Sequence, residues 1–139
     1  MVARLAQQVL QPPRDLSKSE KASWEYVRVS GLGIIPGLCC PHHDQVQSNG
    51  VHRAKDFDQM LLRNPGEVGI CIDNSAAFIV EGDNWRTISA DPEHGAGVRR
   101  KVVDNGVVTQ SDLACEAAWL PLEQIMCPPD FVTLNLSRL

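Results

Sequence analysis

The sequence lacks any long hydrophobic run. No stretch approaches the roughly 18 apolar residues that a membrane-spanning helix needs. The N-terminus has neither the long apolar segment nor the small-residue cleavage site of a secretory signal. We therefore expect a soluble, cytoplasmic protein with no membrane partner.

A basic stripe is also lacking. The formal net charge is -4, and the tight basic cluster is Arg99, Arg100 and Lys101. Nucleic-acid-binding domains usually carry a basic face, so we expect no nucleic-acid partner. We interpret the short cluster as a solvated end of a strand or loop.

Paired cysteines are missing as well. The chain has five cysteines, an odd number, and no two of them form a CxxC pair. This pattern argues against a disulfide framework and fits a reducing compartment. With 43% hydrophobic and 22% charged residues among 139, the composition suits one globular domain with its own core.

The middle of the chain has the pattern of a strand, a helix and a second strand. Residues 34–40 form an apolar run, residues 52–63 show helical apolar spacing, and residues 68–72 are strongly apolar. This order predicts a βαβ unit, and hence two parallel strands.

Two β-hairpins are expected to follow. The first joins residues 76–80 to residues 85–89 through a polar turn. The second joins residues 99–103 to residues 106–108 through an Asp-Asn-Gly turn. The two ends of the chain have weaker secondary-structure patterns.

Residues 1–11 and 113–122 have helical character, and residues 26–29 have strand character. Residues 126–139 are expected to form a loosely held tail.

A dense group of reactive side chains follows the first predicted strand. The group is Cys39-Cys40-Pro41-His42-His43-Asp44, and ligands of open α/β sheets bind outside the carboxyl ends of strands. Three interpretations stay open: an ordinary loop, a zinc-type site, or a catalytic histidine that activates a serine. Neighbouring residues of an extended chain point to opposite faces, which disfavours convergence on one metal ion.

The stretch WEYVRVSGLGIIPGLCCPHHD, residues 24–44, resembles the peptidase E and cyanophycinase-like serine peptidases. In that family a Gly-Leu-Gly segment with two apolar residues runs into a Cys-Pro-His corner. The resemblance continues at Arg53, which opens the predicted helix, and through VGICIDNSAAFIV, residues 68–80. It implies that His42 is the catalytic base and that His43 supports it.

The resemblance also implies binding roles for neighbouring polar residues. Asp44 belongs to the Cys-Pro-His corner. Arg53 is expected either to face the active-site cleft or to lie on the helix surface. Asp73 is expected either to line the site or to cap the turn between two strands through its own backbone.

The fold implied by the family is α/β. We expect a partial class I glutamine-amidotransferase-like, or flavodoxin-like, parallel sheet with C-terminal β-hairpins. The chain would divide into a divergent N-terminal segment at residues 1–23, the C-terminal half of the family domain at residues 24–110, and an extension at residues 111–139. No cofactor and no metal are implied.

The nucleophile of the family has no counterpart in this chain. The family holds its serine on a strained strand-to-helix turn, whereas residues 1–15 contain neither serine nor glycine. The serines farther along follow no predicted strand; they are Ser17, Ser19 and Ser23. A cysteine nucleophile is disfavoured because Cys39 and Cys71 lie in predicted buried strands rather than on an exposed turn.

The acidic partner of the histidine is not identified either, since Asp15 and Glu20 lie in the right region without a matching local sequence. Two hypotheses follow. The chain is a truncated serine hydrolase of aspartyl dipeptides, inactive alone because it lacks a nucleophile, which would take a peptide substrate if completed. Alternatively, it is a non-catalytic interaction protein that pairs through an open sheet edge, as a homo-oligomer or with a homologue.

Overall fold

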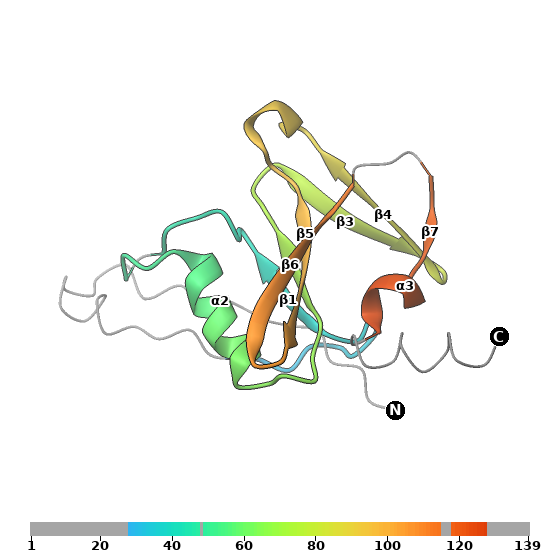
Figure 1. Cartoon of the computed structure of the whole chain (residues 1–139). Coiled ribbons are helices and arrows are strands. Elements are labelled where there is room, and N and C mark those ends of the chain that lie inside the picture. The colour runs from blue at the N-terminus through green and yellow to red at the C-terminus, as the bar shows by residue number, and fades with distance from the viewer. Residues whose placement is uncertain (1–27, 48, 115–117, 128–139) are drawn as a thin grey trace.

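The computed structural model describes residues 28–47, 49–114 and 118–127 (Figure 1). The elements in chain order are β1 (Leu38–Pro41), α2 (Arg53–Leu62), β2 (Gly69–Ile72), β3 (Ala76–Glu81), β4 (Asn84–Ser89), the 3-10 helix η1 (Pro92–His94), β5 (Val98–Asp104), β6 (Val107–Leu113), β7 (Leu120–Pro121) and α3 (Glu123–Met126). Among these residues, no helix combines the length and the hydrophobicity that a transmembrane span requires.

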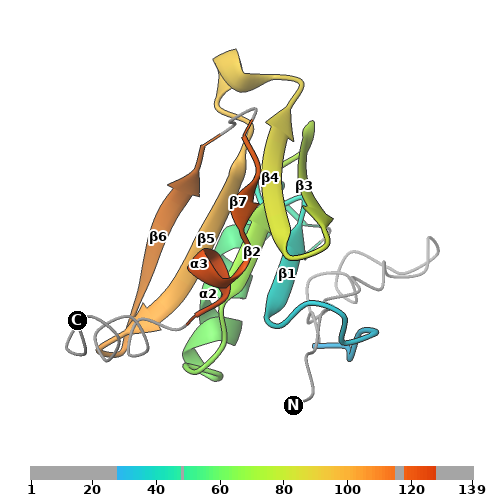
Figure 2. The ribbon, with the colours of Figure 1, turned by 90° about the vertical axis from the view of Figure 1, so that its right-hand side faces the viewer.

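The elements pack as three layers. The central sheet has the strand order β1-β2-β5-β6, and the second sheet has the order β3-β4-β7. Helix α2 covers one face of the central sheet and the second sheet lies against the other, as Figures 1 and 2 show. The described part of the chain is therefore an α/β arrangement of two sheets and one covering helix.

The βαβ prediction is confirmed. Strands β1 and β2 run parallel, with Cys40 opposite Cys71 in the register, and α2 connects them. Every other strand pair of the described part is antiparallel.

The predicted parallel, flavodoxin-like sheet is therefore not confirmed, although the α/β class is. The reason is the second hairpin. Strand β5 runs antiparallel to β2, and the tight Asn105-Gly106 turn folds β6 back along β5. Both residues of this turn have positive φ angles, 48° and 79°, which is the geometry that two-residue hairpin turns favour.

Both predicted hairpins are present, as β3–β4 and β5–β6. The helix predicted for residues 113–122 is wrong. Strand β6 continues to Leu113 in register with Val98, and β7 occupies Leu120–Pro121 beside β4. Pairing with neighbouring strands, which local spacing does not encode, overrides the weak helical pattern.

Other predictions fall wholly or partly outside the described residues. These are the helix at residues 1–11, half of the strand at residues 26–29 and most of the tail at residues 126–139. The two described residues of that predicted strand, Arg28 and Val29, are not in a strand.

Two hydrophobic clusters hold the layers together. Between α2 and the central sheet, Phe57 and Leu61 pack against Leu38, Cys40 and Cys71, all of them at most 1% exposed. Between the two sheets, a second cluster is built from the other face of the central sheet; its buried members are Val68, Ile70, Trp85, Val98, Val102 and Ile125. Each face of the central sheet is therefore buried, as is usual for sheets that contain parallel strands.

The parallel pair places two loops side by side. The loop after β1 begins at His42, and the loop after β2 begins at Asp73. A hydrogen bond from the His43 backbone N–H to the Ile72 carbonyl, at 3.0 Å, continues the pairing into the first loop. The polar groups that the sequence singled out therefore meet at the carboxyl ends of β1 and β2.

Candidate functional site

A pocket of about 470 Å³ lies at these carboxyl ends. Its polar lining comes from the loops after β1, β2 and β4 and from side chains of β5 and β6. The lining side chains that matter for its chemistry are His43, Asp44, Asp73, Ser75, His94 and Arg99. The site therefore lies where open α/β sheets bind ligands.

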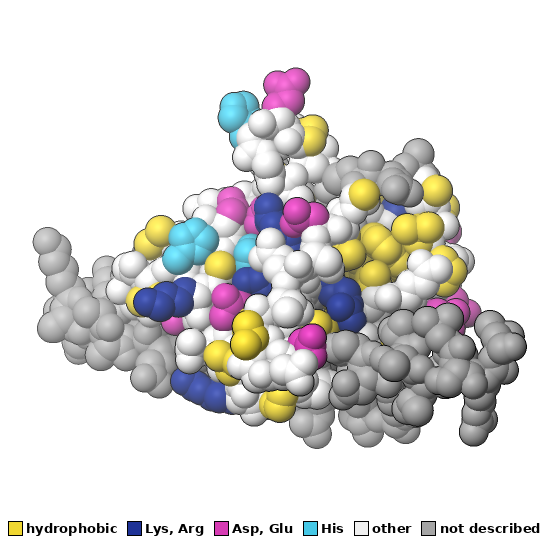
Figure 3. Space-filling view, in the orientation of Figure 1, with side chains coloured by type: hydrophobic (Ala, Val, Ile, Leu, Met, Phe, Trp, Pro, Cys, Tyr) yellow, Lys and Arg dark blue, Asp and Glu magenta, His cyan; other side chains and the backbone are white. Residues whose placement is uncertain are grey.

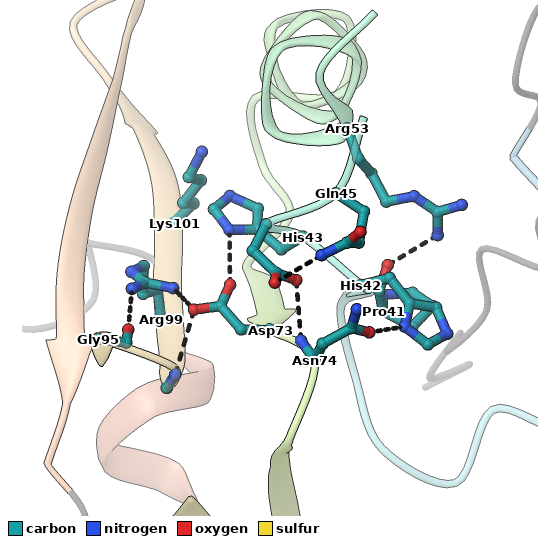
Figure 4. Close-up of polar contacts among 12 residues, drawn as sticks. Pro41, His42, His43, Gln45, Arg53, Asp73, Asn74, Gly95, Arg99 and Lys101 are labelled. Carbon is teal, nitrogen blue, oxygen red and sulfur yellow. Dashed lines mark hydrogen bonds and ion pairs between the residues drawn. The ribbon is translucent and has the colours of Figure 1, made fainter. Parts of the chain in front are cut away.

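Asp73 is the centre of the polar network (Figure 4). Its side chain is 3% exposed, and one carboxylate oxygen, Oδ1, lies 3.3 Å from Nδ1 of His43. The other, Oδ2, accepts a hydrogen bond of 3.1 Å from the Gly97 backbone N–H and forms an ion pair with the Arg99 guanidinium. A buried carboxylate held by three donors ties the end of β2 to β1 and β5.

His43 is buried, and its surroundings favour the neutral form of the imidazole. Burial lowers its pKa below the ordinary value, the nearby Lys101 ammonium lowers it further, and the hydrogen bond to Asp73 acts in the opposite direction. Because Asp73 is a carboxylate, the Nδ1–H of His43 donates to it. This leaves Nε2 as an acceptor, and this buried atom has no hydrogen-bond partner within the described part of the chain.

Lys101 is buried on the face of the central sheet that α2 covers. It is 4% exposed, and its Nζ lies 2.6 Å from the Asp58 carboxylate of α2. The interpretation of residues 99–101 as a solvated strand end is therefore wrong. Val98 and Val102 of β5 lie between the two sheets, so the alternation of the strand directs Arg99 and Lys101 to the helix side, where they pair with Asp73 and Asp58.

The stability of the chain is expected to fall as the pH drops below about 6.5, because of His43. Its pKa is lower in the folded chain than the ordinary 6.5, so between the two pKa values the unfolded chain binds the additional proton. Stability therefore rises with pH through this window, with a contribution that approaches about 1.4 kcal/mol per pH unit. Urea unfolding at several pH values from about 5 to 7.5 measures this slope.

The control for this slope is a second histidine. His43→Gln removes the titrating group, so the slope in the window is expected to decrease by the contribution of one proton. His94→Gln changes a side chain that is 81% exposed, and it should leave the slope of the wild-type chain nearly unchanged. Identical slopes for the wild type and His43→Gln would contradict the assignment of this pH dependence to His43.

His42, the predicted catalytic base, lies outside the pocket lining. It is exposed, and its Nδ1 contacts the side-chain oxygen of Asn74 rather than a carboxylate. Its φ angle is 52°, in the left-handed region that residues other than glycine rarely adopt. The pocket instead receives its neighbour His43, because the backbone reverses at His42.

Asp44 fixes the loop after β1 to the loop after β2. Its carboxylate accepts hydrogen bonds from the Asn74 backbone N–H, at 2.8 Å, and from the Gln45 side chain, at 2.9 Å. Partial burial acts to raise the pKa of Asp44, but these hydrogen bonds outweigh it, and the pKa is lowered. Asp44 therefore presents a stable negative charge at the mouth of the pocket.

Arg53 opens α2, as predicted, and is buried. Its guanidinium donates a hydrogen bond of 2.7 Å to the Pro41 carbonyl at the end of β1, and its backbone N–H donates to the Gln45 carbonyl at 2.9 Å. Figure 4 shows it reaching over the end of β1. Arg53 is not among the residues that line the pocket.

Sequence reasoning missed Ser75 and the loop after β4. Ser75 lines the pocket with a φ angle of 63°, and strained positions of this kind cluster at functional sites. The residues missed on the other loop are Asp91 and His94, which contact each other beside the pocket. An Asp-Pro-x-His-Gly sequence is a turn signal, but nothing local places it next to His43.

The chemistry of nucleophilic catalysis is not assembled in the described residues. There, neither His42 nor His43 is hydrogen-bonded to a serine hydroxyl or a cysteine thiol. Burial raises the pKa of Cys39 to about 11, so its thiol is protonated at neutral pH. No group of three or more metal-ligating side chains that could hold a metal ion occurs in this part of the chain.

Comparison with known proteins gives a partial match. The chain is 40% identical over 62 residues to a G2/mitotic-specific cyclin-1 of Trypanosoma brucei brucei, which covers 45% of this chain and 19% of that protein. The chain thus spans about a fifth of the length of this curated relative. No family model matches the sequence, and no solved structure matches it.

The predicted relationship to peptidase E is corrected by these findings. The matching relative carries the name of a cyclin, and no family model supports a peptidase. The prediction of a truncated serine hydrolase, and of a peptide substrate, is wrong on the same ground. The site roles of His42, His43, Asp44, Arg53 and Asp73 stay predictions, as does the division of the chain at residues 23 and 110.

Proposed function

We propose that this chain is a non-catalytic protein that binds a protein partner along β1, an edge strand of the central sheet in the described part of the chain. The partial match to a protein named as a cyclin supports a role other than hydrolysis. So does the described pocket, in which no nucleophile is joined to a histidine. The observation that carries the proposal is an edge strand preceded by exposed apolar side chains.

Strand β1 pairs on one side with β2, and it is the last strand of the central sheet in the described part of the chain. Figure 2 shows β1 at the opposite end of this sheet from β6. The Leu38 backbone N–H donates to Val68 at 2.8 Å. Because alternate residues of a parallel strand face opposite neighbours, the backbone of Cys39 is directed to the open side. Such an edge is a template for another strand.

The segment that leads into β1 is apolar and exposed. Leu32 and Ile34 are 91% and 78% exposed. Contiguous apolar surface on a soluble protein marks interaction sites. A chain that paired with β1 would cover these two side chains at the same time.

The occupant we infer is a second copy of this chain. Homo-oligomers most often have twofold symmetry, in which the same patch meets itself. Two β1 strands related by a twofold axis run antiparallel, and the two central sheets would join into one continuous sheet. Residues Leu32 and Ile34 of each copy would then lie near the joined edges.

Sedimentation equilibrium of the purified full chain at micromolar concentrations tests the proposal. We expect a reversible dimer, and we expect Ile34→Lys to weaken it by about tenfold or more, because a lysine charge would have to be buried or displaced. The matched control is Val107→Lys, which places the same charge at a 63% exposed valine of the β5–β6 hairpin. That variant should dimerise like the wild type.

Three outcomes would contradict the proposal. A chain that stays monomeric, or a dimer that Ile34→Lys leaves unaltered, would exclude pairing at this edge. Turnover of an Asp-X dipeptide that is lost in His42→Ala would show that the chain is catalytic after all.

A further inference from the structure

The second sheet has an outer face, directed away from the central sheet. Along β4, Trp85 and Thr87 are buried, so the alternation of the strand directs Arg86 and Ile88 to the opposite side. On β3, Ile79 lies opposite Arg86 in the register. We call this side the outer face; its residues are Ala77, Ile79, Arg86, Ile88 and Trp119.

The outer face is largely apolar. Ile88 is 48% exposed and Trp119, which precedes β7, is 37% exposed. Hydrophobic side chains gather over β3, β4 and β7 at the right of Figure 3. Apolar patches of this kind mark sites of association.

Arg86 is the unusual member of this face. Its guanidinium carbon lies 4.6 Å from the centre of the Trp119 ring, a cation–π contact that fixes the side chain against the sheet. Its Nε is buried and has no hydrogen-bond partner, and Arg86 forms no ion pair in the described part of the chain. Among the described residues, Arg86 therefore presents a positive charge that has no ion-pair partner and lies against the Trp119 ring.

The two arginines of β5, in contrast, have ion-pair or hydrogen-bond partners. Arg99 forms ion pairs with Asp73 and Asp112. Arg100 donates to the carbonyls of Ile125, at 2.7 Å, and Cys127, at 2.6 Å. Leaving a buried donor unsatisfied costs free energy, so the open position at Arg86 fits an acceptor that comes from outside.

We propose that the outer face docks a segment of a protein partner in which a carboxylate is flanked by apolar side chains. The carboxylate binds the Arg86 guanidinium, whose planar fork matches it in a bidentate geometry. The flanking side chains cover Ile79, Ile88 and the Trp119 ring. Arginine and tryptophan at the centre of an apolar patch are the residues that dominate protein–protein binding energies.

Charge favours this occupant over a nucleic acid or a membrane. Phosphate backbones and anionic lipid surfaces are bound by several cations acting together. Among the described residues of the outer face, Arg86 is the single cation. The inference rests on the proposed function, the binding of a protein partner, but it concerns a surface separate from β1.

Fluorescence anisotropy with a labelled peptide, Leu-Asp-Phe-Asp-Leu, tests the inference on the full chain. We expect Arg86→Met to weaken binding of this peptide by about tenfold or more. A matching peptide with asparagine in place of aspartate should bind the wild type as weakly as the aspartate peptide binds Arg86→Met. The control Arg63→Met removes the same charge from an exposed position at the end of α2 and should leave binding unchanged.

Equal binding of the two peptides by the wild type, or unaltered binding by Arg86→Met, would overturn the inference. Loss of binding in Arg63→Met as well would show that only net charge matters, which also overturns it. Unfolding midpoints of Arg86→Met and the wild type must agree, and Arg86→Lys, which keeps the charge without the planar fork, gives a second folded variant. Ile34→Lys should retain peptide binding, so failure of the β1 proposal is distinguishable from failure of this one.

Discussion

Asp73→Ala is expected to destabilise the folded chain by about 3 to 5 kcal/mol. The substitution removes the carboxylate that neutralises Arg99 and accepts the Gly97 N–H and the His43 Nδ1–H. Three donors at the meeting point of β1, β2 and β5 then lose their partner. All three are buried or partly buried, where an unpaired group does not fully recover its hydrogen bonds from water.

Urea unfolding at neutral pH measures this effect against a matched aspartate. Asp91→Ala alters a carboxylate on the rim of the same pocket that is 47% exposed and contacts His94, so we expect a change within about 0.5 kcal/mol. Asp73→Asn keeps the size and one acceptor and should lie between the two. A loss below about 1 kcal/mol for Asp73→Ala would show that the network does not hold the strand ends together.

The network gives His43 and Asp73 a role that needs no catalysis. Lys101 and Asp58 connect β5 to α2, while Asp73 connects β5 to β2 and, through His43, to β1. Charges that are buried in this way must be paired, and each pair here joins a different element of the fold. Together, these pairs fix the relative positions of three strands and a helix beside the pocket.

Much of the fold was predictable because its signals are local. The apolar runs before Pro41 and Asp73, with a helical pattern between them, predicted β1, α2 and β2, and the Asp104-Asn105-Gly106 turn predicted the second hairpin. The direction in which β5 joins β2 has no such signal. Strand β5 pairs with β2 antiparallel and the hairpin adds β6 beside it, so the sheet is mostly antiparallel where the sequence indicated a parallel one.

The site was predicted less well, for a related reason. The sequence singled out His42 and His43 together, but His42 has a left-handed backbone and is exposed, whereas His43 is buried and lines the pocket. Lys101 looked solvated because a basic cluster usually is. Its burial follows from the central position of β5, which is a property of the strand order rather than of the cluster.

Gly69→Ala is expected to destabilise the chain by roughly 1 to 3 kcal/mol, as overpacked cores do. A Cβ atom at Gly69 would lie 2.6 Å from Cε1 and 2.9 Å from Cζ of the Phe57 ring, closer than carbon atoms approach. Gly69 is the first residue of β2, and the absence of its side chain lets α2 seat Phe57 directly on the sheet. Gly66→Ala is the control, since a Cβ atom there meets nothing within 4 Å.

A double-mutant cycle separates this steric clash from a general intolerance of β2 to a side chain at position 69. Phe57→Leu alone should destabilise the chain on the order of 1 kcal/mol, because a fully buried ring is replaced by a smaller side chain. If the ring is what a Cβ at Gly69 strikes, the smaller side chain makes room for it. The Gly69→Ala, Phe57→Leu chain should then lose less stability than the two single losses added together, by about 0.5 to 3 kcal/mol. Additive losses would instead place the cost of Gly69→Ala in the strand itself, and the close seating of α2 on β2 would not depend on the glycine.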